Sequence, residues 1–126
     1  MQIHVFTDGS CLNNGKENAK ASFSYQIYEE TNDFFCEIFR ETNVVPQNEK
    51  QSNNTGELFA IKNALKFLIE NGYKKKKIQI FTDSMYCINS VSDDGDKWYV
   101  NWEKSGWKKP IENNKLIRDI IVTHWV

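Results

Sequence analysis

The chain has 126 residues, of which 40% are hydrophobic and 13% aromatic, and its formal net charge is −1. This length allows one domain, and the aromatic content argues against a disordered chain. The three cysteines are too few and too scattered for a disulfide framework, which favours a reducing compartment. No apolar stretch approaches the ~18 residues of a membrane span, and the polar start does not resemble a signal peptide. We therefore expect no membrane contact and a cytoplasmic or nuclear location.

Three segments at the start of the chain are predicted to be strands. Residues 2–8 form an apolar run that ends at Asp8, and residues 21–28 follow the turn-forming sequence Asn13-Asn14-Gly15. Residues 34–39 form the third segment, and consecutive strands of this kind are typical of antiparallel hairpins. Strict alternation in the third segment predicts Phe34, Cys36 and Ile38 on one face and Phe35, Glu37 and Phe39 on the other.

A polar loop over residues 43–54 separates these strands from the clearest helix of the chain, over residues 57–71. Its apolar positions recur at the helical period, and Asn71-Gly72 is a plausible C-terminal stop. The apolar residues on this face are Leu58, Ile61, Leu65 and Leu68. Residues 77–82 then predict a fourth strand, which a helical crossover would place parallel to an earlier one.

The last third of the chain is predicted to hold two helices, a basic aromatic segment and an ambiguous end. Residues 84–91 predict a short helix, residues 98–109 are rich in tryptophan and lysine, and residues 114–120 favour a further helix. Residues 121–126 fit either a fifth strand or the continuation of that helix, and periodicity does not decide such a short run.

The tripeptide Phe-Thr-Asp occurs twice, each time at the end of a predicted strand, and places Asp8 and Asp83 at equivalent positions. Because parallel strands end at the same edge of a sheet, we expect both carboxylates at that edge. Glu57, at the start of the predicted helix, can point back towards them and favours the positive end of the helix dipole. Three hard oxygen ligands of this kind suit Mg²⁺ or Mn²⁺.

Each of these carboxylates also has a purely structural interpretation. Asp83 could cap the next helix, Asp8 with Gly9 could form a turn, and Glu57 could merely stabilise its own helix. The repeated position at two strand ends favours the metal site over three separate structural roles.

Three motifs in this order resemble those of type 1 ribonuclease H over essentially the whole chain. The motifs are Thr7-Asp8-Gly9-Ser10-Cys11, Asn53-Asn54-Thr55-Gly56-Glu57-Leu58 and Phe81-Thr82-Asp83-Ser84. The resemblance implies a single α/β domain over residues 1–126 with a mixed five-stranded sheet, whose first three strands are antiparallel and whose later strands are parallel. It also implies flanking helices and an absent C-terminal segment.

The resemblance implies a divalent-metal-dependent endonuclease that hydrolyses the RNA strand of RNA–DNA hybrids, leaving 5′-phosphate and 3′-hydroxyl ends. Asp8, Glu57 and Asp83 would be the catalytic carboxylates, and they would bind metal together with Gly9. Two Mg²⁺ ions per site, with Mn²⁺ as a substitute, would activate water and stabilise the leaving oxygen. We expect a monomer, and the sequence identifies no protein partner.

The resemblance also assigns residues to the nucleic acid. Ser10, Cys11, Asn14, Ser52, Asn53, Asn54 and Ser84 match positions near the hybrid, where a contact to a 2′-hydroxyl distinguishes RNA from DNA. For the asparagines, turn formation is the alternative. Residues 98–110 resemble a basic protrusion in which Trp102, Trp107 and Lys108 would grip the DNA strand. Packing of Trp98 and Trp102 on the core is the alternative there.

The chain departs from the family pattern at its end. Family members continue with a glycine-histidine loop and a helix that carries a fourth acidic ligand. His124 does not match the loop histidine, and no residue of 84–126 is a convincing fourth ligand, with the direction of Asp119 in its predicted helix left open. We therefore expect impaired activity, with a shortened chain, a ligand from a partner or a catalytically silent binding module as open explanations. A DNA-directed nuclease or transposase-type core is a further alternative, which the tryptophan-lysine segment disfavours.

Overall fold

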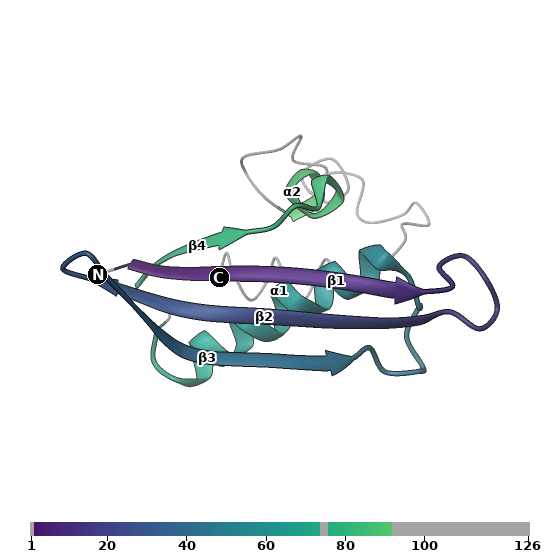
Figure 1. Ribbon diagram of the computed structural model, residues 1–126, viewed down its shortest axis with the longest axis horizontal. Coiled ribbons are helices and arrows are strands. Elements are labelled where there is room, and N and C mark those ends of the chain that lie inside the picture. The colour runs from purple at the N-terminus through teal and green to yellow at the C-terminus, as the bar shows by residue number, and fades with distance from the viewer. Residues whose placement is uncertain (1, 74–75, 92–126) are drawn as a thin grey trace, which may run out of the picture.

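The computed structural model describes residues 2–73 and 76–91 of the chain. These residues form a sheet with the strand order β3-β2-β1-β4, which α1 covers on one face (Figure 1). The strands are β1 (Gln2–Leu12), β2 (Lys20–Thr31), β3 (Phe34–Val44) and β4 (Lys77–Phe81), and the helices are α1 (Asn53–Glu70) and α2 (Met85–Val91). The expected mixed α/β class is confirmed, whereas the predicted fifth strand, the helix over 114–120 and the segment 98–110 lie outside the described residues.

The pairing of the strands agrees with the sequence-based prediction. β1 pairs antiparallel with β2, β2 pairs antiparallel with β3, and β4 returns through α1 to pair parallel with β1. The last pair between β1 and β4 joins Phe6 to Phe81, yet β1 continues to Leu12. Beyond this pair β1 therefore has no neighbour on its β4 side among the described residues. Asp8 and Asp83 come two residues after this last pair, at the unpaired edge of β1.

The predicted division of β3 into two faces is wrong, because the register of β3 against β2 shifts once along the strand. Phe39 stacks on Phe67 of α1, with ring centroids 4.1 Å apart. Phe35 instead packs against His4, at 5.1 Å, on the face that α1 does not cover. Such a bulge inserts one residue and reverses the alternation of side chains beyond it.

The core lies between the sheet and α1. It joins alternate residues of β1 and β2 to the apolar face of the helix, as the periodicities of two and 3.6 residues require. Its fully buried members with the largest side chains include Ile3, Val5, Ile27, Leu58 and Leu68. None of the helices in the described part of the chain combines the length and the apolar character needed to cross a bilayer.

α1 begins four residues earlier than the sequence predicted. Ser52 is its N-cap, and the Ser52 hydroxyl accepts the Thr55 backbone N–H at 3.1 Å. The Asn53-Asn54 pair, expected in the loop, is thus the first part of the helix. The predicted stop is confirmed, since Asn71 is the C-cap and Gly72 follows with φ of 85°.

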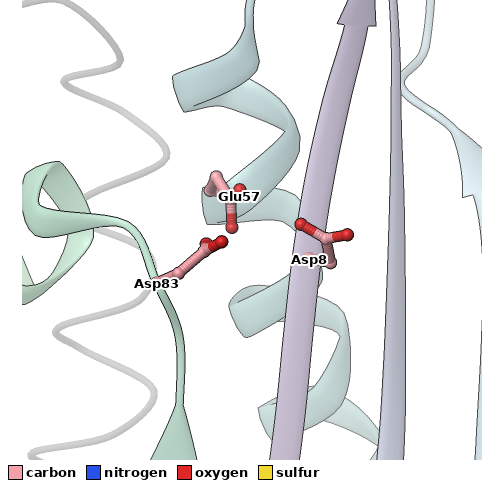
Figure 2. A group of neighbouring side chains, drawn as sticks. All are labelled: Asp8, Glu57 and Asp83. Atoms are coloured by element: carbon pink, nitrogen blue, oxygen red, sulfur yellow. The ribbon is translucent and has the colours of Figure 1, made fainter.

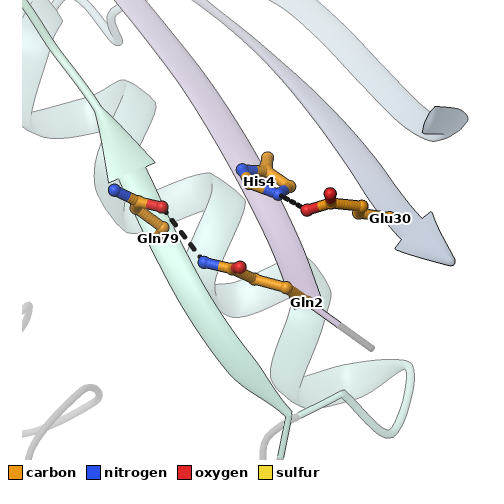
Figure 3. Close-up of polar contacts among 4 residues, drawn as sticks. All are labelled: Gln2, His4, Glu30 and Gln79. Carbon is orange, nitrogen blue, oxygen red and sulfur yellow. Dashed lines mark hydrogen bonds and ion pairs between the residues drawn. The ribbon is translucent and has the colours of Figure 1, made fainter. Parts of the chain in front are cut away.

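The opposite face of the sheet carries polar pairs and aromatic rings. Gln2 donates to Gln79 at 3.0 Å, and the His4 ring lies 2.7 Å from Glu30 (Figure 3). Next to them Phe6 stacks on Phe81 of β4, with ring centroids 4.9 Å apart, and 43% of the Phe6 surface remains exposed. These contacts join β1 to both of its neighbours on the side away from α1.

Candidate active site

Three carboxylates meet where β4 leaves the sheet. Asp8 lies on β1, Asp83 directly follows β4, and Glu57 extends from α1, so that one oxygen from each lies within 4.8 Å of the others. Figure 2 shows the three side chains facing one another from these separate elements. The expected convergence of the repeated strand-end aspartates with Glu57 is therefore present in the structure.

Asp83 is not the N-cap of α2, which was the structural alternative for this residue. The Ser84 hydroxyl accepts the Cys87 backbone N–H at 3.2 Å, and Ile88 donates to the Ser84 carbonyl oxygen at 3.1 Å. Ser84 therefore caps the helix, and the exposed Asp83 carboxylate faces the other two acids instead.

Glu57 is not in the first turn of α1, contrary to the prediction. The helix begins at Asn53, so Glu57 is its fifth residue, and the first turn holds no acidic side chain. Favourable interaction with the helix dipole falls off within the first turn, so it does not account for this carboxylate. Glu57 is nearly buried, with 8% of its surface exposed.

The surroundings of Glu57 disfavour its charged form. Burial, followed by the nearby negative charges of Asp8 and Asp83, raises the pKa of the Glu57 carboxyl from 4.5 to about 7, although a backbone hydrogen bond from Gly9 opposes this. Its Oε2 atom is buried and has no hydrogen-bond partner among the described residues. A buried polar atom without a partner is costly and points to a missing ligand.

The donor set fits a divalent cation. Carboxylate oxygens are the ligands that Mg²⁺ and Mn²⁺ prefer, and a positive ion between the acids would satisfy Glu57 Oε2 and offset the repulsion. The side chains that would hold it are Asp8, Glu57 and Asp83. Gly9, predicted as a further ligand, donates its backbone N–H to Asp8 Oδ1 at 3.0 Å and so orients that carboxylate.

The asparagines predicted to bind substrate lie together beside this site. The Asn14 side chain accepts the Asn53 backbone N–H at 3.1 Å and so connects the β1–β2 turn to the start of α1. Asn13, next to it, has φ of 55°, as the turn interpretation requires. Asn53 is exposed and Asn54 half-buried, so their side chains remain near the surface at this edge.

The other residues predicted to contact nucleic acid lie partly next to the acids and partly outside the described residues. The exposed Ser10 hydroxyl is 2.8 Å from the Ser22 hydroxyl, and the half-buried Cys11 thiol donates to the Leu12 carbonyl oxygen at 3.5 Å. Ser10 and Cys11 lie beyond Asp8 on β1, and Ser84 lies beyond Asp83. Trp102, Trp107 and Lys108 lie outside the described residues.

Ser52, another predicted substrate contact, has a clear structural role as the N-cap of α1. Replacing it with alanine removes the acceptor for the Thr55 backbone N–H, and we expect the free energy of unfolding to fall by about 1 kcal/mol. Urea unfolding followed by circular dichroism measures this change. Ser52→Asn keeps a capping acceptor and should stay near the unsubstituted protein, so equal losses in both variants would contradict the capping role.

Two residues of this region were not singled out from the sequence. Gly56 lies where α1 approaches the sheet most closely, and a Cβ there would be only 2.6 Å from the Ser22 carbonyl oxygen. Glycine in a helix interior is unfavourable, which was the available signal. Gln51 accepts the Ala21 backbone N–H at 2.7 Å and donates to the Pro46 carbonyl oxygen at 2.8 Å. Nothing in its local sequence indicated this.

Comparison with known proteins identifies the family. The RNase H family model matches residues 1–124. The chain is similar to ribonuclease H of Clostridium botulinum, with 32% identity over 91% of this chain and 70% of that protein. It is also similar to ribonuclease HI of Haemophilus influenzae, with 34% identity over 91% of this chain and 65% of that protein.

A solved structure supports the same fold. LC9-RNase H1, described as a type 1 RNase H with the type 2 active-site motif, matches with a TM-score of 0.75 and 23% identity, over 97% of this chain and 57% of that one. The chain spans about two thirds of the length of the two ribonucleases named above. With the family match, the identities and the fold in agreement, the chain belongs to the ribonuclease H family of hydrolases.

Proposed function

We propose that this protein hydrolyses the RNA strand of RNA–DNA hybrids with the help of divalent metal ions. The observation that supports this most strongly is the convergence of Asp8, Glu57 and Asp83 within 4.8 Å in a chain of the ribonuclease H family. Mg²⁺ is the proposed ion, with Mn²⁺ as its substitute, because three carboxylates form a hard and strongly negative ligand set.

The three acids would hold the metal ions that the reaction needs. When bound, two divalent ions would supply an activated water and stabilise the charge on the leaving 3′ oxygen, giving 5′-phosphate and 3′-hydroxyl ends. Asp8, whose carboxylate accepts the Gly9 backbone N–H, would be one of the residues that hold the ions. Glu57 and Asp83 would supply the other carboxylate ligands that hold the ions.

Recognition of the hybrid would take place along the same edge. Asn53 and Asn54 emerge from the start of α1, and the Asn14 side chain fixes that start to the β1–β2 turn. Amide side chains there can hydrogen-bond to 2′-hydroxyls or base edges in the minor groove of a hybrid. Trp102, Trp107 and Lys108 are proposed to bind the phosphates and sugars of the DNA strand.

A cleavage assay tests this function. We expect the protein to cut the RNA strand of an end-labelled hybrid in Mg²⁺ or Mn²⁺, and a chelator to abolish the reaction because the acids then repel the phosphate. Gel electrophoresis of the products checks both the cut and the identity of the ends. Duplex DNA and duplex RNA of the same sequence are the controls and should remain intact.

Other results of the same assay would support different functions. Tight binding of the hybrid without cleavage in either metal would support the catalytically silent binding module. Cleavage of duplex DNA would support a DNA-directed nuclease. Neither binding nor cleavage of the hybrid would contradict the proposal.

A further inference from the structure

The backbones of β1, β2 and α1 touch directly beside the carboxylates, at Gly9 and Gly56. A Cβ on Gly9 would lie 2.3 Å from the Glu57 backbone nitrogen, and a Cβ on Gly56 would lie 2.6 Å from the Ser22 carbonyl oxygen. Both obstacles are backbone atoms, which cannot rotate out of the way as a flexible side chain can. Any side chain at either position would therefore force the helix and the sheet apart.

These two glycines are the chain neighbours of two of the acids. Gly9 follows Asp8 on β1, and Gly56 precedes Glu57 on α1. The distance between the two backbones therefore fixes the separation of the Asp8 and Glu57 Cα atoms, from which the carboxylates extend. Gly56 also lies inside a helix, where alanine is intrinsically more favourable than glycine. The close contact with β2 gives a physical reason for glycine at this position.

We infer that the contact of Gly56 with β1 and β2 acts as a spacer that sets the separation of Asp8 and Glu57 required to bind a divalent cation. Gly56 is thus a positioning residue, acting through Glu57. This inference rests on the proposed function, because it assumes that the three acids bind metal.

The steric overlap of a Cβ at position 56 indicates how far α1 would have to move from the sheet. To move from 2.6 Å to the 3.4 Å of an ordinary contact, a Cβ at position 56 and the Ser22 carbonyl oxygen must separate by about 0.8 Å. Metal–ligand distances tolerate deviations of only ~0.2 Å. A shift of the helix by part of this amount would change the distance from Glu57 to an ion held by Asp8 by more than that tolerance.

Mn²⁺ binding to the full chain, measured by isothermal titration without nucleic acid, tests the inference independently of cleavage. We expect Gly56→Ala to weaken Mn²⁺ binding by roughly tenfold or more, as substitutions that misplace metal ligands commonly do. Ala64→Val is the matched control, because Ala64 is a fully buried residue of the same helix, two turns beyond Gly56. It should lower the thermal midpoint while leaving Mn²⁺ affinity within about twofold.

A second substitution separates positioning from general damage. Asp8→Glu lengthens the opposite ligand by one methylene, so it should weaken Mn²⁺ binding alone but restore part of it in the Gly56→Ala background. If circular dichroism shows Gly56→Ala to be unfolded, Ala60→Val is measured instead, because Ala60 is fully buried one turn beyond Gly56 and closer to Glu57 along the helix than Ala64 is, and the same loss of Mn²⁺ affinity is expected.

The outcomes distinguish failure of the spacer from failure of the proposed metal-dependent function. Unchanged Mn²⁺ affinity in the folded variant, an equal loss in Ala64→Val, or no recovery with Asp8→Glu would overturn the spacer. If the unsubstituted protein fails to bind Mn²⁺, the proposed metal-dependent function is overturned and the spacer with it.

Discussion

Replacing Asp8 with asparagine is expected to lower metal-dependent cleavage of an RNA–DNA hybrid by at least about a thousandfold, or on the order of 4 kcal/mol of transition-state stabilisation. Asp8 supplies one of the three clustered carboxylates, and an amide is neutral and a weaker ligand for a hard cation. Single-turnover cleavage in saturating Mn²⁺ measures the chemical step. Hybrid binding should persist or improve, because one carboxylate no longer repels the phosphates.

Asp33→Asn is the matched control for this substitution. Asp33 is exposed in the turn between β2 and β3, and its φ of 69° is one that asparagine also tolerates. The rate of cleavage should stay within about twofold of the unsubstituted protein, since surface changes away from a site have small effects. An Asp8→Asn variant that folds and still cleaves at the original rate would remove Asp8 from the proposed mechanism.

The pH dependence of stability is the second large expected effect, and it arises from Glu57. In the metal-free protein the raised pKa means that the folded state binds the proton more tightly than the unfolded chain does. The stability that the Glu57 proton contributes is therefore fully present below about pH 4.5 and is lost as the pH rises through about 7. Once the carboxyl is ionised, a pKa raised from 4.5 to about 7 corresponds to a loss of up to about 3 kcal/mol in the free energy of unfolding.

Denaturant unfolding between pH 5 and about 8 in a chelator measures this loss, and Glu57→Gln should remove most of it. That variant should be more stable than the unsubstituted protein near pH 8, while losing the stabilisation that Mn²⁺ gives. Glu70→Gln, at an exposed position at the end of α1, is the matched control and should keep the original pH profile. A metal-free protein whose stability does not change over this range would contradict the assigned environment of Glu57.

Much of the sheet and of the acidic site could be predicted from the sequence. The apolar runs before Asp8 and Asp83 predicted two strands, and the helix before the second run predicted that the two pair parallel, although β1 continues past Asp8 to Leu12. The long helix followed from its 3.6-residue period, and Asn71-Gly72 marked its end. These signals are local, since periodicity and turn chemistry act over a few neighbouring residues.

The two errors have different sources. The start of α1 was misplaced because its N-cap, Ser52, is a local signal that the prediction did not use. The faces of β3 were misassigned, because the register against β2 shifts by a residue and turns Phe39 towards α1. No periodicity within β3 itself contains that information.

The sequence by itself determined which acids belong together and the order of the first elements. Only the tertiary structure decided that Ser84 rather than Asp83 caps α2, and that Glu57 is buried with an oxygen that has no partner in the described part of the chain. It also decided that α1 approaches the sheet closely enough to exclude a Cβ at Gly56. Burial, charge repulsion and backbone contact depend on distances between segments far apart in the chain, and these exist only once the sheet and helix have packed.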